Sequence, residues 1–182
     1  HTVLLAGLAA AITVFVALVL AFNRRQVKRG GFFSMAQLGY ALPGSVLAVG
    51  IMLSFTFIDN QLLIPLQRLF GMSPAPVLVG SILTLLAAYW IRFLSVASGP
   101  LESSLERIRP SLPEAARTLG ANGSDLVWRI YLPMLRPGLL TAAVLVFVDV
   151  MKEMPATLLL RPFGWDTLAV RIYEMTAEGQ WQ

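Results

Sequence analysis

Three ionisable residues stand inside an apolar run near the C-terminal end of the chain. Asp149, Lys152 and Glu153 lie within the hydrophobic stretch 137–160, and Pro155 follows them. Asp149 and Lys152 are three residues apart, so on a helix they share a face and can form an ion pair. Charged groups inside a membrane helix are costly and usually face a cavity or a partner. We therefore expect either a structural ion pair or a segment that lines or gates the mouth of a polar pathway.

The side chains that most catalytic and metal sites require are scarce in this chain. The 182 residues include no cysteine, and the single histidine is the first residue, His1. This composition leaves no thiolate and no internal imidazole for a Ser–His pair or a zinc site, which argues against a membrane-embedded hydrolase. The carboxylates of Asp59, Asp149 and Glu153 are oxygen ligands of the kind that hard cations prefer, yet no spacing brings them together. We predict no catalytic residue, no cofactor and no metal site.

A polar stretch, residues 98–136, interrupts the apolar sequence before that run. Its first part predicts a short helix in which Ser111 and Glu114 form a capping box. Pro113 falls in the first turn, where its missing N–H costs little. Gly120 is placed to end this helix, because glycine tolerates the left-handed backbone that follows many helix C-termini.

The rest of the polar stretch predicts a second short helix. Asn122 or Ser124 can cap its N-terminus. Leu132 is expected to end it, because the residue before a proline, here Pro133, is pushed out of the helical region. Two short amphipathic helices joined by a glycine turn can lie on lipid headgroups or present a surface to another protein. The residues alone leave both interpretations open.

The elements that must hold these residues are membrane-spanning helices. The chain is 57% hydrophobic and 13% charged, with a mean hydropathy of +0.71, whereas soluble domains carry about a quarter charged residues. A span needs roughly 20 mostly apolar residues to cross about 30 Å of hydrocarbon. We therefore predict a single all-α transmembrane domain over residues 1–182. Its spans are expected at about 3–22, 36–58, 76–97 and 137–160, with a polar loop at 98–136.

The distribution of basic residues predicts the orientation of these spans. Arginine and lysine are concentrated in 23–35 and 98–136, whereas the 59–76 connection contains only Arg68. The order of the spans puts the two basic regions on the same side, which the positive-inside rule makes cytoplasmic. Residues 59–76 and 161–182 then face outward. The basic residues set topology, and no nucleic-acid partner is expected.

Two further groups of residues are expected to position the helices. Tyr89 and Trp90 are typical of the aromatic belt at a membrane interface. Gly44, Gly50 and Gly80 are typical of positions where helices pack closely.

The polar region carries a spaced signature, E-A-A-x3-G-x9-I-x-L-P, that resembles the cytoplasmic coupling loop of ABC importer permeases, the binding-protein-dependent type I family. Its seven positions are Glu114, Ala115, Ala116, Gly120, Ile130, Leu132 and Pro133. Segments 39–48, 92–94 and 146–170 resemble the ferric-iron branch of that family. The version of the fourth span found here resembles the C-terminal half of permeases that fuse two homologous halves.

The resemblance implies a type I importer helix bundle, truncated here, because the family's half-unit normally has one more span at each end. It also implies three protein partners. An ABC ATPase dimer in the cytoplasm receives the coupling loop, a periplasmic substrate-binding protein delivers the substrate, and a second permease half, fused or separate, completes the pathway. Lipid surrounds the spans.

By this resemblance, the chain is a multi-pass permease of the bacterial inner membrane. It performs no chemistry itself and moves its substrate, ferric iron, by alternating access while the partner hydrolyses ATP. The seven signature residues couple to the ATPase, and Asp149, Lys152, Glu153 and Pro155 belong to the pathway or its gate. An importer of the same type for thiamine, sulfate or molybdate is the alternative. A channel or scaffold without ATP coupling is a further alternative.

Overall fold

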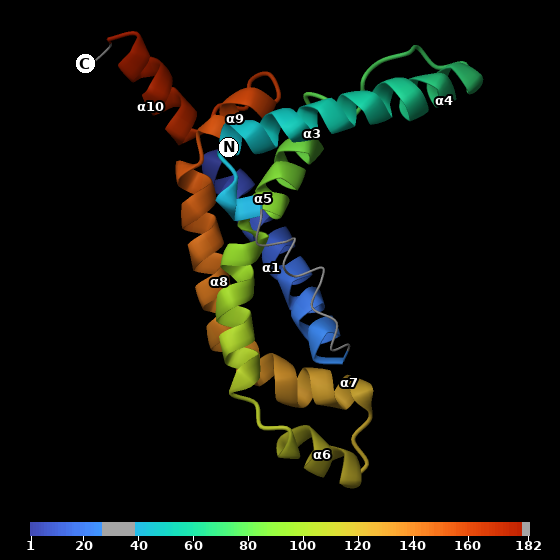
Figure 1. Ribbon diagram of the computed structural model, residues 1–182, viewed down its shortest axis with the longest axis vertical. Helices are drawn as coiled ribbons and strands as arrows, with labels where there is room; N and C mark the ends of the chain where they lie inside the picture. The colour runs from blue at the N-terminus through green and yellow to red at the C-terminus, as the bar shows by residue number, and fades with distance from the viewer. Residues whose placement is uncertain (27–38, 180–182) are drawn as a thin grey trace.

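Within the described residues, three long helices form the body of the molecule. The computed structural model describes residues 1–26 and 39–179. Helices α1 (Thr2–Gln26), α5 (Ile82–Glu106) and α8 (Leu132–Lys152) pack against one another in all three pairings. Figure 1 shows them as the long axis of the molecule, with shorter helices at both ends.

Small side chains let the three long helices approach one another closely. Ala6 of α1, Ala88 of α5 and Ala142 of α8 are completely buried. A Cβ atom added at Gly138 of α8 would lie 2.8 Å from the carbonyl oxygen of Pro100 on α5, so the crossing of these helices requires glycine. Small residues at helix contacts are typical of membrane proteins, in which close packing rather than the hydrophobic effect drives helix association.

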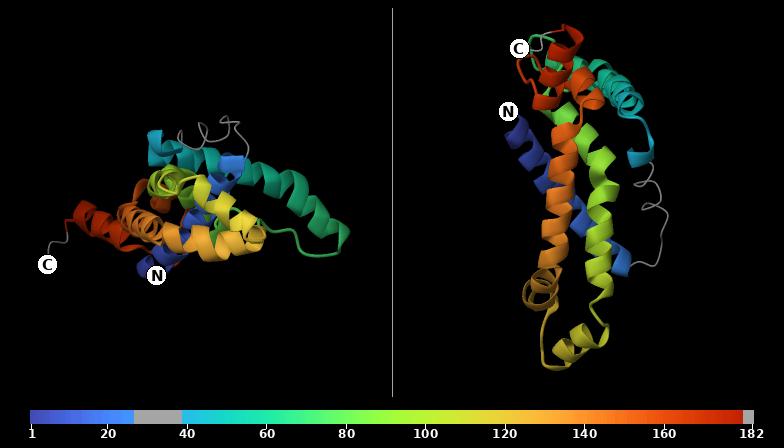
Figure 2. Two further views of the ribbon diagram at one scale, coloured as in Figure 1. Left: turned by 90° about the horizontal axis from the view of Figure 1, so that it is seen from below. Right: turned by 90° about the vertical axis from the view of Figure 1, so that its left-hand side faces the viewer.

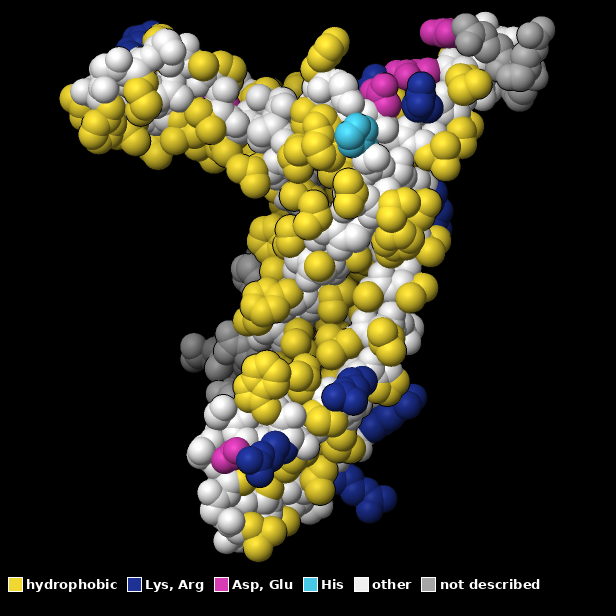
Figure 3. All heavy atoms as spheres, turned by 180° about the vertical axis from the view of Figure 1, so that it is seen from behind, with side chains coloured by type: hydrophobic (Ala, Val, Ile, Leu, Met, Phe, Trp, Pro, Cys, Tyr) yellow, Lys and Arg dark blue, Asp and Glu magenta, His cyan; other side chains and the backbone are white. Residues whose placement is uncertain are grey.

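Large apolar side chains cover the outside of the bundle. Phe15 is 66% exposed and Leu140 is 68% exposed, and hydrophobic side chains spread over the body in Figure 3. Such a surface suits lipid rather than water. The described residues contain four helical runs that are long and apolar enough to cross a membrane, which confirms the prediction of an all-α membrane protein. These runs are Thr2–Phe22, Gly44–Leu69, Ile82–Glu106 and Gly123–Lys152.

The second of these runs is longer than predicted and leaves the bundle as an arm. Helix α3 (Gly44–Ile58), the π-helical turn η1 (Asp59–Leu63) and α4 (Ile64–Leu69) follow one another without a break. The arm projects sideways from one end of the body in Figure 1. Within the described residues, the span expected at 36–58 therefore begins only at Gly44. The polar connection expected at 59–76 is helical over its first half.

A buried carboxylate allows the helix to continue through this polar sequence. Asp59 is only 1% exposed. Its carboxylate oxygens accept hydrogen bonds from the backbone N–H groups of Val77 (3.2 Å), Leu78 (3.1 Å) and Val79 (2.9 Å). A buried charge is tolerated when hydrogen bonds satisfy it, and here these bonds also fasten the following loop to the arm.

The third run begins and ends later than the expected span at 76–97. The side chain of Ser81 accepts a hydrogen bond from the N–H of Thr84 and caps α5, so the helix begins at Ile82 rather than at Pro76. It continues to Glu106, because Leu101 and Leu105 are buried against the bundle. The expected polar region 98–136 therefore starts as part of a long helix and leaves it only at Arg107.

Two short helical segments occupy one end of the body. They are α6 (Ser111–Thr118) and the segment made of α7 (Gly123–Asp125) and the π-helical turn η2 (Leu126–Tyr131), which runs directly into α8. The predicted helix end at Leu132 is wrong. Pro133 instead lies in the first turn of α8, immediately after η2, and a π-helical turn can absorb such an irregularity in the hydrogen-bond ladder.

The opposite end of the body carries the remaining described elements. Helix α8 stops at Lys152, Glu153 is extended, and α9 (Pro155–Leu160) and α10 (Leu168–Ala177) follow. Figure 2 shows α9, α10 and the arm at one end of the body and α6 and α7 at the other. Most of the predicted basic loop 23–35 lies outside the described residues.

Candidate functional site

The first candidate site is the α6–α7 end of the molecule. Glu114, Ala115 and Ala116 lie on α6, and Glu114 and Ala115 are exposed. Pro113 is the single buried residue of this described helix. Most of the surface of α6 is therefore open to a partner.

Local hydrogen bonds explain the shape of this end. Gly120 has a φ of +87°, the left-handed conformation predicted for the residue that ends α6. The Asn122 side chain accepts a hydrogen bond from the N–H of Asp125 (3.0 Å), and the Asp125 carboxylate accepts one from the N–H of Asn122 (3.4 Å). This reciprocal pair is a capping box, and it confirms Asn122 as the cap of the second helix.

The capping box predicted at Ser111 and Glu114 is wrong. The residue at the N-cap of α6 is Pro110, and no side-chain hydrogen bond caps the helix. Ser111 is already the first residue of α6, so its hydroxyl lies inside the first turn and not before it. A capping box forms instead after the glycine turn, between Asn122 and Asp125.

The signature residues group around three hollows beside α6. Ala116, Gly120 and Ile130 line a hollow of about 360 Å³. Glu114 lines a second, of about 470 Å³, together with residues of η2, and Ala115 lines a third, of about 450 Å³. Leu132 and Pro133 begin α8 instead. Five of the seven residues thus line these hollows, and the other two begin α8.

The two most exposed large apolar residues at this end were not predicted as part of the site. Leu119 is 88% exposed at the end of α6, and Trp128 is 67% exposed on η2. Tryptophan is enriched in the buried centre of protein interfaces, and an exposed leucine adds apolar area beside it. Other apolar residues such as Leu126 and Ile130 stand close to them in the sequence, so no local pattern marked these two.

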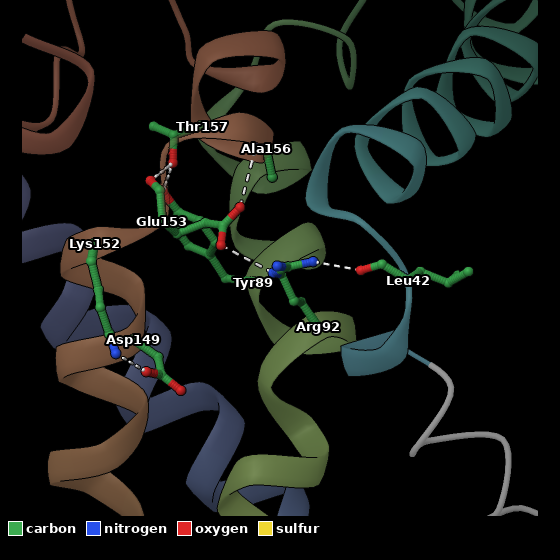
Figure 4. A network of polar contacts seen from close by, with 8 residues as sticks. All are labelled: Leu42, Tyr89, Arg92, Asp149, Lys152, Glu153, Ala156 and Thr157. Atoms are coloured by element: carbon green, nitrogen blue, oxygen red, sulfur yellow. Dashed lines mark hydrogen bonds and ion pairs between the residues drawn. The ribbon is translucent and has the colours of Figure 1, made fainter. Parts of the chain in front are cut away.

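The second candidate site is the break between α8 and α9. Lys152 Nζ lies 2.8 Å from Asp149 Oδ1, which confirms that the two residues pair. The helix ends there as expected: Glu153 is extended (φ −73°, ψ 111°), and Pro155 begins α9. Glu153 does not join the pair formed by Asp149 and Lys152, as Figure 4 shows.

Glu153 instead forms an ion pair with Arg92 of α5. Arg92 Nε donates to Glu153 Oε2 at 3.0 Å, and Arg92 Nη1 donates to the carbonyl of Leu42 at 2.9 Å. The other carboxylate oxygen of Glu153 accepts from the N–H of Ala156 at 3.2 Å. Two side chains thus connect the residues before α3, the middle of α5 and the start of α9 (Figure 4).

A pair of hydroxyl groups supports this connection in addition to the ion pair. Thr157 Oγ1 lies 2.6 Å from the Tyr89 hydroxyl and donates to the Glu153 carbonyl at 2.7 Å. Tyr89 is completely buried, so its expected place in an exposed aromatic belt is wrong. Its neighbour Trp90 packs against the core as a partly buried residue.

The expected packing glycines differ in their surroundings. A Cβ atom at Gly44 would lie 2.6 Å from Glu153 Oε1 and 3.3 Å from the Arg92 guanidinium, whereas one at Gly50 would meet nothing within 4 Å. Gly80 has a φ of +76° and belongs to a turn. Gly44 is therefore the one packing position among the three.

Arg92 and Tyr89 are the residues of this site that sequence reasoning missed. For Arg92, the available signal was a charged residue in an apolar span, the same signal that identified Asp149 and Glu153. Around the break, the cations Arg92 and Lys152 balance the carboxylates of Glu153 and Asp149, respectively. No group of three or more His, Cys, Asp or Glu residues that could hold a metal occurs in the part of the chain that the structure describes.

Comparison with protein families gives a match over most of the chain. The model of the family described as "Binding-protein-dependent transport system inner membrane component" matches residues 13–181. This range contains both candidate sites.

Individual relatives are similar at modest identity. The chain is 28% identical over 184 residues to the "Fe(3+)-transport system permease protein FbpB 2" of Haemophilus influenzae, which covers 100% of this chain and 33% of the relative. It is 28% identical over 162 residues to the "Putative 2-aminoethylphosphonate transport system permease protein PhnV" of Salmonella typhimurium, covering 88% of this chain and 55% of the relative. The chain therefore spans about a third to about half of the length of these curated relatives.

A third relative matches over a shorter stretch. The "Ferric transport system permease protein FbpB" of Actinobacillus pleuropneumoniae is 31% identical over 90 residues, which are 50% of this chain and 13% of that protein. Similarity to iron-transport permeases agrees with the resemblance found in the sequence.

Proposed function

The chain belongs to the family of binding-protein-dependent transport system inner membrane components, and from this premise we propose that it is the permease part of an ATP-driven importer. In this role it forms part of the route by which a substrate crosses the bacterial inner membrane. An ATPase dimer supplies the energy from the cytoplasm, a periplasmic binding protein supplies the substrate, and a second permease half completes the route.

The open surface of α6 is the observation that carries this proposal. A helix with one buried residue, exposed Glu114 and Ala115, and the exposed apolar Leu119 nearby offers much contact area for its length. Small alanine side chains allow another protein to approach the backbone closely. The capping box at Asn122 and the turn at Gly120 fix the position of α6 relative to η2, so a force on α6 reaches α8 through continuous helix.

The break between α8 and α9 is the part of the chain that we assign to the pathway or its gate. A charged pair, Asp149 and Lys152, and an interrupted helix occur together there. Interrupted helices in membranes are tolerated where the backbone is buried in protein or lines a water-filled cavity. Alternating access would then change the environment of this break at the outer end of the molecule.

Ferric iron is the substrate that we favour, because segments 39–48 and 146–170 carry the resemblance to iron permeases and one such relative matches the whole chain. The match to an aminoethylphosphonate permease supports a second candidate, an organic phosphonate. The balanced charges at the break favour neither a cation nor an anion.

The coupling role is tested by reversing one charge on α6. In proteoliposomes that contain the complete importer, Glu114→Lys is expected to reduce ATP-dependent uptake to the level seen without ATP, because the substitution places the wrong charge in the docking surface. Membrane insertion should be unchanged. Glu106→Lys, at an exposed position of α5 outside α6, is the matched control and should retain uptake. Equal uptake by wild type and Glu114→Lys would remove the coupling assignment.

The substrate is tested in the same proteoliposomes with the two candidate binding proteins. Radiolabelled iron and labelled 2-aminoethylphosphonate are offered separately, each with its own binding protein. Uptake of iron alone supports the favoured substrate, whereas uptake of the phosphonate alone replaces it with the second candidate. ATP-dependent uptake of neither, with thiamine, sulfate or molybdate transported instead, would refute both.

A further inference from the structure

One of the three hollows beside α6 differs from the others in its charge. It lies where α5 ends and α6 begins and has a volume of about 450 Å³. No acidic residue lines it. Its lining residues are Arg107, Arg109, Ser111, Leu112, Ala115 and Met134.

The two arginines of this hollow are not neutralised within the part of the chain that the structure describes. Neither Arg107 nor Arg109 forms a salt bridge there, whereas Arg129, beside the 360 Å³ hollow, lies 3.4 Å from Asp125. The 470 Å³ hollow is lined by both Glu114 and Arg117. Among these three hollows of the described residues, only the one at the α5–α6 junction therefore has unbalanced positive charge.

A buried residue holds the two arginines in place. Ile108, which lies between them, is 2% exposed and packs in a cluster with Ala21 of α1 and Leu135 of α8. Arg107 and Arg109 therefore belong to a turn that is packed against all three long helices. Two guanidinium groups on a fixed backbone suit the bidentate recognition of phosphate oxygens, and the hydroxyl of Ser111 adds a further donor.

The hollow directly follows a helix that is long enough to cross a bilayer. Helix α5 has 25 residues, which makes it about 36 Å long at 1.5 Å per residue, slightly more than the hydrocarbon core of about 30 Å. A helix of this length crosses the hydrocarbon core with a few ångströms to spare, so the residues directly after it can reach the headgroup layer. Leu112 and Met134 in the lining are each 42% exposed and give a lipid molecule an apolar contact next to the charges. Basic side chains gather toward this end of the body in Figure 3.

We propose that the hollow at the α5–α6 junction binds the phosphate headgroup of an anionic phospholipid. The lipid would sit between the end of α5 and the start of α6, and would hold the position of α6 relative to the membrane. The assignment to the cytoplasmic leaflet rests on the proposed function and its orientation. The binding site itself rests on the residues of the hollow.

The test measures lipid binding to the full-length permease in neutral detergent by native mass spectrometry. The protein is titrated separately with phosphatidylglycerol, with phosphatidylcholine and with inorganic phosphate. Phosphatidylglycerol should remain bound where phosphatidylcholine does not. The double variant Arg107→Gln/Arg109→Gln is expected to bind phosphatidylglycerol about 30-fold more weakly, the effect of removing two arginines from the surface of an anionic lipid.

A matched variant distinguishes the hollow from general surface charge. Arg117→Gln/Arg129→Gln removes the same charge from the same end of the molecule and should change binding less than about twofold, within the usual scatter of surface substitutions. Arg107→Lys/Arg109→Lys retains the charge but loses the planar fork, so it should bind with intermediate strength. Circular dichroism confirms that each variant is folded.

Three results would overturn the proposal. Equal weakening by the two glutamine double variants would show diffuse attraction rather than a site. Unchanged binding in Arg107→Gln/Arg109→Gln would place the lipid elsewhere. Binding of inorganic phosphate without retention of phosphatidylglycerol would make the hollow a site for a free anion. The lipid-binding measurement needs neither ATPase nor substrate, so its result can be interpreted even if the transport proposal fails.

Discussion

Arg92 and Glu153 bind backbone groups of neighbouring segments as well as each other. Their side chains are 16% and 8% exposed, and together they satisfy the carbonyl of Leu42 and the N–H of Ala156. Removing one partner of a buried ion pair leaves the other charge uncompensated, whereas replacing both by apolar groups of similar volume can be neutral. Loss of either residue alone should therefore destabilise the protein more than loss of both.

The first prediction concerns this pair. Glu153→Gln should lower the free energy of unfolding by about 3 kcal/mol, because it leaves the Arg92 guanidinium buried without a counter-charge. The measurement is unfolding of the purified permease in mixed micelles. The double variant Arg92→Met/Glu153→Leu should lose less than the sum of its two single variants. Lys152→Gln, which breaks a pair whose lysine is 68% exposed, should cost at most about 1 kcal/mol.

The second prediction concerns the glycine that faces the same pair. Gly44→Ala should destabilise the permease, because its Cβ would lie 2.6 Å from Glu153 Oε1 and would push the carboxylate from Arg92. Gly50→Ala has open space around it and should stabilise α3 by roughly 0.5–1 kcal/mol, the usual gain for alanine over glycine inside a helix. The same unfolding assay compares both variants, and a loss of equal size in the two would contradict the close approach at Gly44.

At the scale of elements, hydrogen-bonding side chains decide where helices begin. Asn122 and Asp125 cap the second short helix, Ser81 caps α5 and Thr167 caps α10. Ser111, which fits the same sequence rule, caps nothing. A capping residue needs an extended backbone before the first turn, and the residue that occupies the N-cap of α6 is Pro110 in a helical conformation.

The third prediction separates these two candidate caps. Asn122→Ala should accelerate hydrogen exchange of the amides in the segment of α7 and η2 by roughly fivefold, since losing such a cap costs about 1 kcal/mol. Ser111→Ala should leave the exchange of α6 unchanged. Amide exchange of the full-length permease, followed by mass spectrometry, measures both. Protection of α7 that survives Asn122→Ala would show that packing rather than the cap fixes this helix.

The existence of the long helices follows from composition, but their limits do not. The apolar periods near 3–22 and 137–160 predicted α1 and most of α8. The limits of α3–α4 and α5 depended on Asp59, whose partners are backbone groups 18 to 20 residues away, and on contacts of Leu101 and Leu105 with other helices. Such long-range contacts leave no local pattern in a sequence.

The candidate sites were predictable to different degrees for the same reason. The pairing of Asp149 with Lys152 is local, three residues along one helix, and it was predicted. The pairing of Glu153 with Arg92 joins residues 61 apart and was missed. At the other end, Gly120 and Asn122 act on their own neighbours and were predicted, whereas the grouping of Ala116 with Ile130 required the fold.

At the scale of the whole molecule, the two ends of the bundle differ in structure. The α6–α7 end has the exposed surface that we propose as a docking site, and the α9–α10 end holds the interrupted helix together with the base of the arm (Figures 1 and 2). The assignment of these ends to the two sides of the membrane is a proposal that rests on the positions of the basic residues.

The fourth prediction tests this orientation by cysteine labelling. The chain has no cysteine, so single substitutions can be introduced without removing native thiols. In spheroplasts, a membrane-impermeant maleimide should label Ser73→Cys, in the exposed loop beyond the arm, but not Leu119→Cys on the α6 side. Permeabilisation should make Leu119→Cys reactive. The reverse pattern would invert the topology and refute the assignment of α6 to the ATPase side.

The continuity of the arm gives the Arg92–Glu153 pair a mechanical meaning. The arm is a rod of 26 residues, about 38 Å long, and Asp59 fastens its outer loop to it. The pair grips the rod at its base, next to Gly44. On that length, a rotation of roughly 5° at the base displaces the tip by roughly 3 Å. Leu47, Ala48 and Ile51 also pack the base of the rod into the core, so a joint rearrangement of these contacts and of the salt bridge would be amplified at the tip.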